Sequence, residues 1–156
     1  LMIRRPPRST LSSSSAASDV YKRHDLTTAA IDLLKDLIGL PSFSKQEDKT
    51  ANRIGEWFNH YGIPYEREGN NLWAKNKAFD PQKPTLLLNS HHDTVKPNTA
   101  YTNDPFEAKI VDGKLYGLGS NDAGGALVSL MALFTHYFDK KKGPYKGALN
   151  FKQLSV

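Results

Sequence analysis

One short apolar run constrains the fold of this chain more than any other feature. Residues Thr85–Asn89 read Thr-Leu-Leu-Leu-Asn, with Pro81 and Pro84 before them and a polar cluster directly after them. A continuous apolar run of this length is typical of a β-strand that is buried on both faces, in a sheet covered by helices. We therefore expect an α/β fold built around this strand.

Helical segments alternate with short strands along the rest of the chain. Apolar residues at helical spacing predict helices over residues 25–38, 44–61 and 127–138. The first helix is expected to begin at Asp25 or Thr27, and the second at a capping box of Ser44 and Glu47. Strands are predicted over residues 65–68, 72–77, 106–111, 114–116 and 147–151. The pattern predicts a three-layer α/β sandwich, in which a mixed sheet is flanked by helices.

Composition excludes several classes of protein. The 156 residues include no cysteine, so a disulfide framework and a thiolate metal cluster are ruled out, and any metal site must use histidine and carboxylate. No apolar run comes near the roughly 18 residues that cross a bilayer. Of the net charge of +5, residues 1–24 carry +4 and the remaining residues carry +1. We therefore expect neither a nucleic-acid partner nor a membrane partner.

Residues 1–24 differ in character from the residues that follow. Met2–Thr10 and Ser14–Arg23 resemble the conceptual translation of two constant sequencing-adapter segments, and residues 11–13 lie where a variable index would sit. We therefore expect residues 1–24 to be a non-native leader, and residues 25–156 to hold the domain. A disordered tail or an organellar transit peptide is the alternative interpretation of this Arg-, Pro- and Ser-rich segment.

The polar cluster after the apolar run carries the first candidate site. It lies at the carboxyl end of a strand, which is the edge where open α/β sheets bind their ligands. In extended backbone, residues i and i+2 project to the same side, so His91 and Asp93 should face together while His92 points away. A carboxylate beside an imidazole fixes its tautomer and makes it a stronger metal ligand. A surface loop with incidental histidines is the alternative.

Asp122 is the second candidate, and it lies within the glycine-rich stretch Gly117–Gly125. Glycines on both sides let the backbone turn tightly and approach a neighbour closely, so that one carboxylate projects just before a helix. Taken alone, Asp122 is interpreted as the N-cap of that helix. Such an Asp can also bridge two cations, because its second oxygen stays free. A dinucleotide-binding loop would need a third glycine at this position.

The order and separation of these two motifs resemble those of the M20 family of metallohydrolases. The resemblance rests on Leu86–Val95, on Asp104-Pro105-Phe106 and on Lys114–Gly125, and it extends over about residues 25–151. Within the family, the motifs are most similar to those of acetylornithine deacetylases. The resemblance implies that residues 25–156 are the amino-terminal portion of a zinc-hydrolase catalytic domain.

The resemblance also implies a role for each candidate residue. His91 would ligate one metal ion, Asp122 would bridge two, and Asp93 would be the catalytic residue that holds His91 and tunes the site. The cofactors would be two divalent metal ions, with zinc first and cobalt or manganese as alternatives. A water shared by the ions would attack an amide carbonyl. His92 occupies a variable position of the family and is assigned to the structure or to the rim of the site.

The implied activity is hydrolysis of the amide bond of a small N-acyl amino acid, namely acetylornithine in arginine biosynthesis. The parent enzyme would be cytoplasmic, and the family's dimerisation domain makes a homodimer the expected assembly. An M20 dipeptidase or carboxypeptidase would share every residue named above, so a dipeptide is the alternative substrate. A catalytically silent binding module is the alternative from another class of protein.

One element of the family is missing from the sequence. The resemblance leads us to expect an adjacent acidic pair about thirty residues beyond Asp122, in which one member is the general base. Asp139 is the only acidic residue after Asp122. We therefore expect the catalytic domain to be truncated, and we expect weak binding of a single metal ion without turnover.

Overall fold

The computed structural model of this chain describes the backbone of residues 14–139 and 148–154, and the side chains of residues 25–139. Its helical elements within these ranges are α1 (Ser14–Ile38), α2 (Asp48–His60), the short kinked segment η1 (Ser120–Gly124) and α3 (Gly125–Tyr137). The strands are β1 (Glu66–Glu68), β2 (Asn71–Lys75), β3 (Thr85–His91), β4 (Lys109–Val111), β5 (Lys114–Tyr116) and β6 (Ala148–Leu154). The predicted alternation of helices and strands is confirmed.

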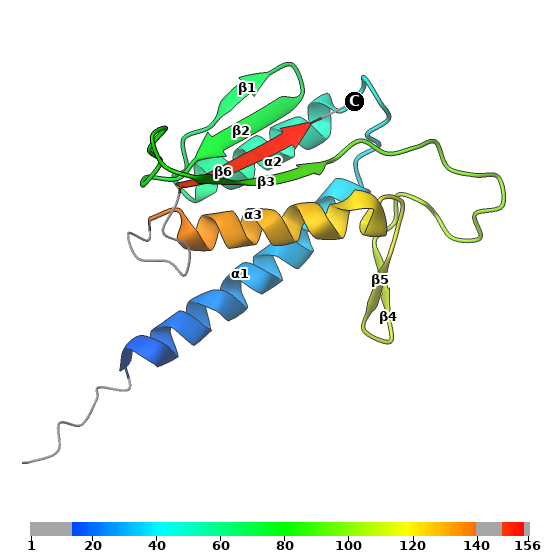
Figure 1. The fold of residues 1–156 in the computed structure, drawn as a ribbon. Helices are drawn as coiled ribbons and strands as arrows, with labels where there is room; N and C mark the ends of the chain where they lie inside the picture. The colour runs from blue at the N-terminus through cyan, green and yellow to red at the C-terminus, as the bar shows by residue number, and fades with distance from the viewer. Residues whose placement is uncertain (1–13, 140–147, 155–156) are drawn as a thin grey trace, which may run out of the picture.

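The larger sheet is mixed, as predicted. Its strand order is β1-β2-β6-β3, in which β3 and β6 are parallel and the other neighbours are antiparallel (Figure 1). The strand β3, which leads to the candidate site, therefore lies at one edge of this sheet within the described residues. The strands β4 and β5 form a separate hairpin outside the larger sheet (Figure 1), and Leu115 of β5 packs against the core.

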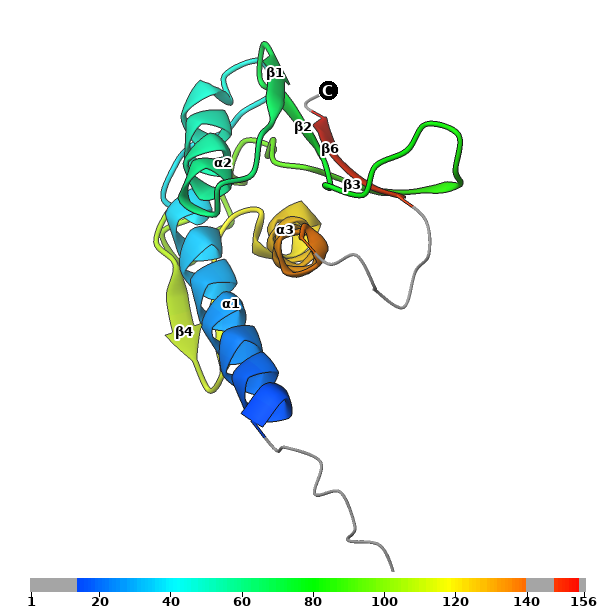
Figure 2. The ribbon, with the colours of Figure 1, turned by 90° about the vertical axis from the view of Figure 1, so that its left-hand side faces the viewer.

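The hydrophobic core lies between the helices and one face of the larger sheet. Figure 2 shows α1, α2 and α3 gathered on the same side of that sheet. Helical spacing places the apolar side chains of each helix on its inner face, where they are excluded from water. The most deeply buried of them, each no more than 3% exposed, include Leu33, Ile38, Ile54, Trp57, Phe58, Leu127, Met131 and Phe134. The sheet contributes Leu72, Ala74 and Leu88 to the same core.

The strand β3 is buried less completely than its sequence predicts. Leu88 is 7% exposed, but Leu86 is 41% exposed and Leu87 is 52% exposed. Leu87 alternates with Leu88 and so faces away from the helices, which cover one face of the sheet within the described residues. The expectation of burial on both faces was therefore wrong for this strand. An apolar run indicates which side chains could be buried, whereas the exposure of each side chain depends on what packs against its face of the sheet.

Two predicted helix starts are also corrected. The helix α1 begins at Ser14 rather than at Asp25 or Thr27. Residues 14–24 contain neither glycine nor proline, so nothing in them interrupts a helix that extends toward the N-terminus. The capping box does not form, because α2 begins at Asp48 and its N-cap, Glu47, makes no side-chain capping bond.

Two pairs of consecutive predicted strands form hairpins, namely β1 with β2 and β4 with β5. The turn between β4 and β5 places Asp112 at φ 50° and Gly113 at φ 73°, which are the two left-handed residues that a tight two-residue turn requires. Residues 1–13 of the predicted leader lie outside the described residues, and the division of the chain at residue 24 stays a prediction. Among the described helices, none has the length and apolar character needed to cross a membrane.

Candidate metal centre

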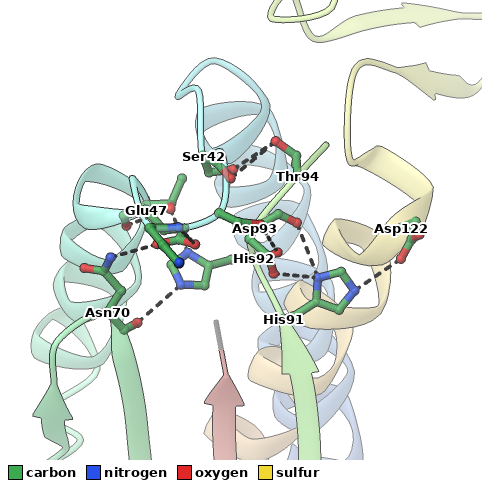
Figure 3. Close-up of polar contacts among 11 residues, drawn as sticks. Ser42, Glu47, Asn70, His91, His92, Asp93, Thr94 and Asp122 are labelled. Atoms are coloured by element: carbon green, nitrogen blue, oxygen red, sulfur yellow. Dashed lines mark hydrogen bonds and ion pairs between the residues drawn. The ribbon is translucent and has the colours of Figure 1, made fainter. Parts of the chain in front are cut away.

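His91 and Asp93 face each other at the end of β3. The Nδ1 atom of His91 lies 3.1 Å from Oδ1 of Asp93 and 3.3 Å from the backbone oxygen of the same residue (Figure 3). The side chain of Asp93 is 13% exposed, whereas that of His91 is 38% exposed. Because water has little access to this carboxylate, its interaction with the imidazole is weakly screened. The predicted projection of both side chains to one side is confirmed.

Asp122 approaches the opposite edge of the same imidazole. Its Oδ1 atom lies 3.2 Å from Nε2 of His91 (Figure 3). Asp122 has an extended backbone at φ −129° and ψ 96°, and α3 begins at Gly125 without a side-chain capping bond. The interpretation of Asp122 as an N-cap was therefore wrong. Its side chain is 90% exposed, which leaves the second oxygen open to another ligand.

The glycine-rich loop reaches this position through close backbone contacts. Gly119 has φ 73°, and a Cβ atom on it would lie 2.6 Å from Cγ2 of Thr94. The N–H of Gly124 donates to the Gly119 carbonyl at 2.8 Å, and a Cβ atom on Gly124 would lie 2.6 Å from a methyl group of Leu34. Only glycine permits both the left-handed turn and these approaches. The loop is thereby held against the residue that follows Asp93.

The number of N–H protons on the His91 ring limits what the site can bind. Both ring nitrogens face carboxylate oxygens, which only accept, yet a neutral imidazole carries a single N–H. If Nδ1 donates to Asp93, then the lone pair of Nε2 faces Oδ1 of Asp122. The separation of 3.2 Å would let this imidazole and this carboxylate hold the same cation, and the two groups together are a donor set that suits zinc. An imidazolium ion, which has two N–H groups, is the metal-free alternative.

The described part of the chain supplies only part of a metal site. Within that part, no group of three or more His, Cys, Asp or Glu residues is placed to hold a metal ion. His91 and Asp122 form a pair of candidate ligands, and Asp93 lies on the other side of the imidazole.

His92 points into the protein, as the alternation along the strand predicts. It is 6% exposed, with Nδ1 at 2.6 Å from Oγ1 of Thr50 and Nε2 at 3.3 Å from the backbone oxygen of Asn70. Burial lowers the pKa of His92, although the Asn70 carbonyl and the nearby carboxylate of Glu47 oppose that shift. The Thr50 hydroxyl also donates to the Glu47 carbonyl at 3.0 Å, so its oxygen is free to accept from Nδ1 of His92, as the Asn70 carbonyl is to accept from Nε2. The structural role of His92 is that of a buried link between three segments.

Ser44, Glu47 and Asn70 lie near the site, and the sequence analysis did not predict their contacts there. The hydroxyl of Ser44 donates to Oδ2 of Asp93 at 3.0 Å. The carboxylate of Glu47 is 1% exposed, and it accepts from the Lys45 amide at 2.7 Å and from Nδ2 of Asn70 at 2.8 Å. Ser44 and Glu47 had been paired in a capping box instead. No local pattern could have revealed a contact between residues 49 positions apart.

Sequence comparisons relate the chain to a family of hydrolases. Residues 87–151 match a family model described as Peptidase family M20/M25/M40. Over 137 residues the chain is 30% identical to a succinyl-diaminopimelate desuccinylase of Beijerinckia indica, a match that covers 81% of this chain and 35% of the relative. The chain thus spans about a third of the length of the curated relatives it matches.

Solved structures share the fold. The dipeptidase Dug1p of Saccharomyces cerevisiae matches with a TM-score of 0.66 at 20% identity, over 90% of this chain and 34% of that protein. The YXEP protein of Bacillus subtilis, a dinuclear metal-binding peptidase from the M20 family, matches with a TM-score of 0.61 at 21% identity, over 85% of this chain and 36% of that protein. These structures confirm the α/β fold, and the family-model match and the desuccinylase relative support the predicted resemblance to M20 hydrolases. The narrower likeness to acetylornithine deacetylases stays a prediction.

Proposed function

We propose that this chain forms part of a divalent-metal centre for amide hydrolysis. The premise is that its homologues are M20-family metallopeptidases and amidohydrolases. The observation that carries the proposal is the 3.2 Å separation between Nε2 of His91 and Oδ1 of Asp122. Asp93 supports it from the other edge of the imidazole, at 3.1 Å from Nδ1. A ring held between two carboxylates presents one nitrogen to a cation while the other keeps its proton.

Each of the three side chains has a distinct task in this proposal. His91 binds a metal ion through Nε2, and Asp93 holds the proton at Nδ1 so that the ring keeps its orientation. Asp122 offers one oxygen beside His91 and a second oxygen, open to solvent, for another ion. When bound, divalent ions supply carbonyl polarisation and an acidified water. The general base and the remaining ligands would come from the part of the relatives that this chain does not span.

The donor set fits borderline metal ions. Imidazole with carboxylate suits zinc, and cobalt or manganese are the alternatives. Because 90% of the Asp122 side chain is exposed, a second ion has access to its free oxygen. We therefore propose a two-metal centre in the whole protein, and weak binding of one ion by this chain alone.

The proposed substrate is a small N-acylated amino acid. The relative at 30% identity is a desuccinylase, and its name favours an N-succinyl diamino acid over an N-acetyl one. Acetylornithine, and with it arginine biosynthesis, stays a prediction that rests on the motifs. A cytoplasmic location and a homodimeric assembly are likewise predictions for the whole protein.

Metal titration of the 156-residue chain tests the proposal. We expect calorimetry with Co²⁺ to show about one site of micromolar to millimolar Kd, weakened at least tenfold in His91→Ala and in Asp122→Asn. His60→Ala is the matched control, because this exposed histidine lies at the end of α2, away from the site. Absent binding, or binding that is equal in wild type and His91→Ala, would contradict the proposal and favour an imidazolium ion at this position.

The substrate class requires the full-length protein. Its metal-loaded form should hydrolyse N-succinyl-diaminopimelate faster than N-acetylornithine and faster than a dipeptide, measured by release of the free amine. Faster hydrolysis of N-acetylornithine would restore the narrower prediction from the motifs. Preference for the dipeptide would refute the N-acyl amino acid.

A further inference from the structure

We propose that Ser44 is a positioning residue of the metal centre and acts through Asp93 on His91; the inference rests on the proposed function. The hydroxyl of Ser44 donates to Oδ2 of Asp93 at 3.0 Å, and Oδ1 of Asp93 accepts from Nδ1 of His91 at 3.1 Å. Ser44 is the donor in the first contact, because a carboxylate only accepts. Each oxygen of Asp93 is therefore engaged by a different side chain.

Two contacts fix the carboxylate of Asp93 where one would not. The terminal torsion of an aspartate is broad, so a carboxylate held by one oxygen can still rotate. The bond from Ser44 to the second oxygen removes that freedom. The plane of Asp93 in turn sets the orientation of the His91 ring, whose Nε2 must face Asp122 to share a cation with it. Loss of the Ser44 hydroxyl should therefore loosen the imidazole and weaken metal binding.

The backbone of Ser44 is held in place independently of its hydroxyl. On one side, Phe43 bridges to Thr94, and the Thr94 amide donates to the Ser42 carbonyl at 2.7 Å. On the other side, the left-handed Lys45 at φ 73° donates its amide to the buried carboxylate of Glu47 at 2.7 Å. These contacts remain when the hydroxyl is removed. Ser44→Ala therefore deletes one hydrogen bond without displacing the segment.

The competing interpretation is that Ser44 makes a surface hydrogen bond that has no effect on His91. The residue is exposed, and a hydrogen bond at the surface can be replaced by one to water. However, its acceptor is shielded, because the side chain of Asp93 is 13% exposed. A water molecule in place of the hydroxyl is not anchored to the backbone, so it would not hold the carboxylate in one plane. The two interpretations differ in what Ser44→Ala does to His91.

The test compares three variants of the 156-residue chain. Ser44→Ala removes the hydroxyl, Ser44→Thr retains it, and Ser129→Ala removes a hydroxyl that donates to the Gly125 carbonyl within α3. We expect Ser44→Ala to weaken Co²⁺ binding about tenfold, near the lower end of what the loss of a ligand-orienting bond costs. Ser44→Thr and Ser129→Ala should stay within about threefold of wild type, and the Co²⁺ absorption spectrum should change only in Ser44→Ala. Equal affinity and an equal spectrum in Ser44→Ala and Ser129→Ala would overturn the inference.

A metal-free measurement separates this inference from the proposed function. In ¹⁵N-histidine spectra assigned with His91→Ala, the proton on Nδ1 of His91 should be visible in wild type and Ser44→Thr, and broadened by exchange in Ser44→Ala. If wild type binds no Co²⁺ but shows this difference, then the proposed function fails while the positioning of His91 by Ser44 stands. If the Nδ1 signal is the same in Ser44→Ala as in wild type, then the positioning role is refuted even where metal binds.

Discussion

The replacement of Gly119 by alanine should disrupt the loop that presents Asp122. The new Cβ would lie 2.6 Å from Cγ2 of Thr94, and the left-handed φ of 73° disfavours any side chain. The conformation costs about 1–2 kcal/mol, and the overpacking costs about 1–3 kcal/mol more. We therefore expect Gly119→Ala to lower the free energy of unfolding by about 2–5 kcal/mol.

Urea unfolding followed by circular dichroism measures this loss. With an m-value of about 1–2 kcal/mol/M, a loss of about 3 kcal/mol lowers the midpoint by roughly 1.5–3 M. Gly69→Ala is the matched control, because Gly69 has φ 58° but no atom within 4 Å of a Cβ. Gly69→Ala should therefore lower the free energy of unfolding only by the cost of the left-handed conformation, about 1–2 kcal/mol.

A double mutant isolates the clash. Thr94→Ser removes the methyl group that the new Cβ would meet and keeps the hydroxyl that faces Ser42. Gly119→Ala should therefore cost less in the Thr94→Ser background than in wild type, by about 1–3 kcal/mol. If Gly119→Ala costs no more than Gly69→Ala, or if Thr94→Ser recovers none of the loss, then the close packing of this loop does not hold Asp122 in place.

Three further predictions concern the core and the site. The pKa of His92 is lowered by burial, so between its folded pKa and about 6.5 the unfolded chain binds more protons than the native chain. The stabilisation of the native chain that comes from this pKa difference is thus fully present above about pH 6.5, and it is lost as the pH falls toward the folded pKa of His92. Urea midpoints measured between pH 5 and 8 should therefore fall as the pH falls, and His92→Gln should reduce the slope of the midpoint against pH. An unchanged slope in His92→Gln would contradict this prediction. Asn70→Ala removes the donor to Oε2 of the buried Glu47 and should cost about 1–3 kcal/mol, measured by the same assay; a neutral outcome would show that water replaces the amide. Phe134→Ala should cost about 3–5 kcal/mol because the ring is fully buried, and a calorimetric loss below 1 kcal/mol would contradict the described core.

The local part of the site could be predicted from sequence. The alternation of side chains along a strand depends only on backbone geometry, so it placed His91 beside Asp93 and turned His92 inward. The glycines around Asp122 likewise indicated a close backbone approach. Asp122 was interpreted as an N-cap when taken alone, and its place beside His91 was expected from the family resemblance.

The errors arose where distant segments compete with local patterns. Ser44 and Glu47 match a capping box, but in the fold Ser44 donates to Asp93 and Glu47 accepts from Asn70. The leucines of β3 could be buried on both faces, yet Leu87 is 52% exposed because the described helices cover the opposite face. Such outcomes depend on three-dimensional neighbours that no spacing rule contains.

The X-ray absorption spectrum of the Zn²⁺-loaded chain tests the central claim most directly. The account predicts nitrogen and oxygen scatterers at about 2.0–2.2 Å, with an imidazole signature that disappears in His91→Ala and persists in His60→Ala. An imidazole signature that survives in His91→Ala, or the absence of any imidazole in wild type, would contradict a metal centre at His91 and Asp122.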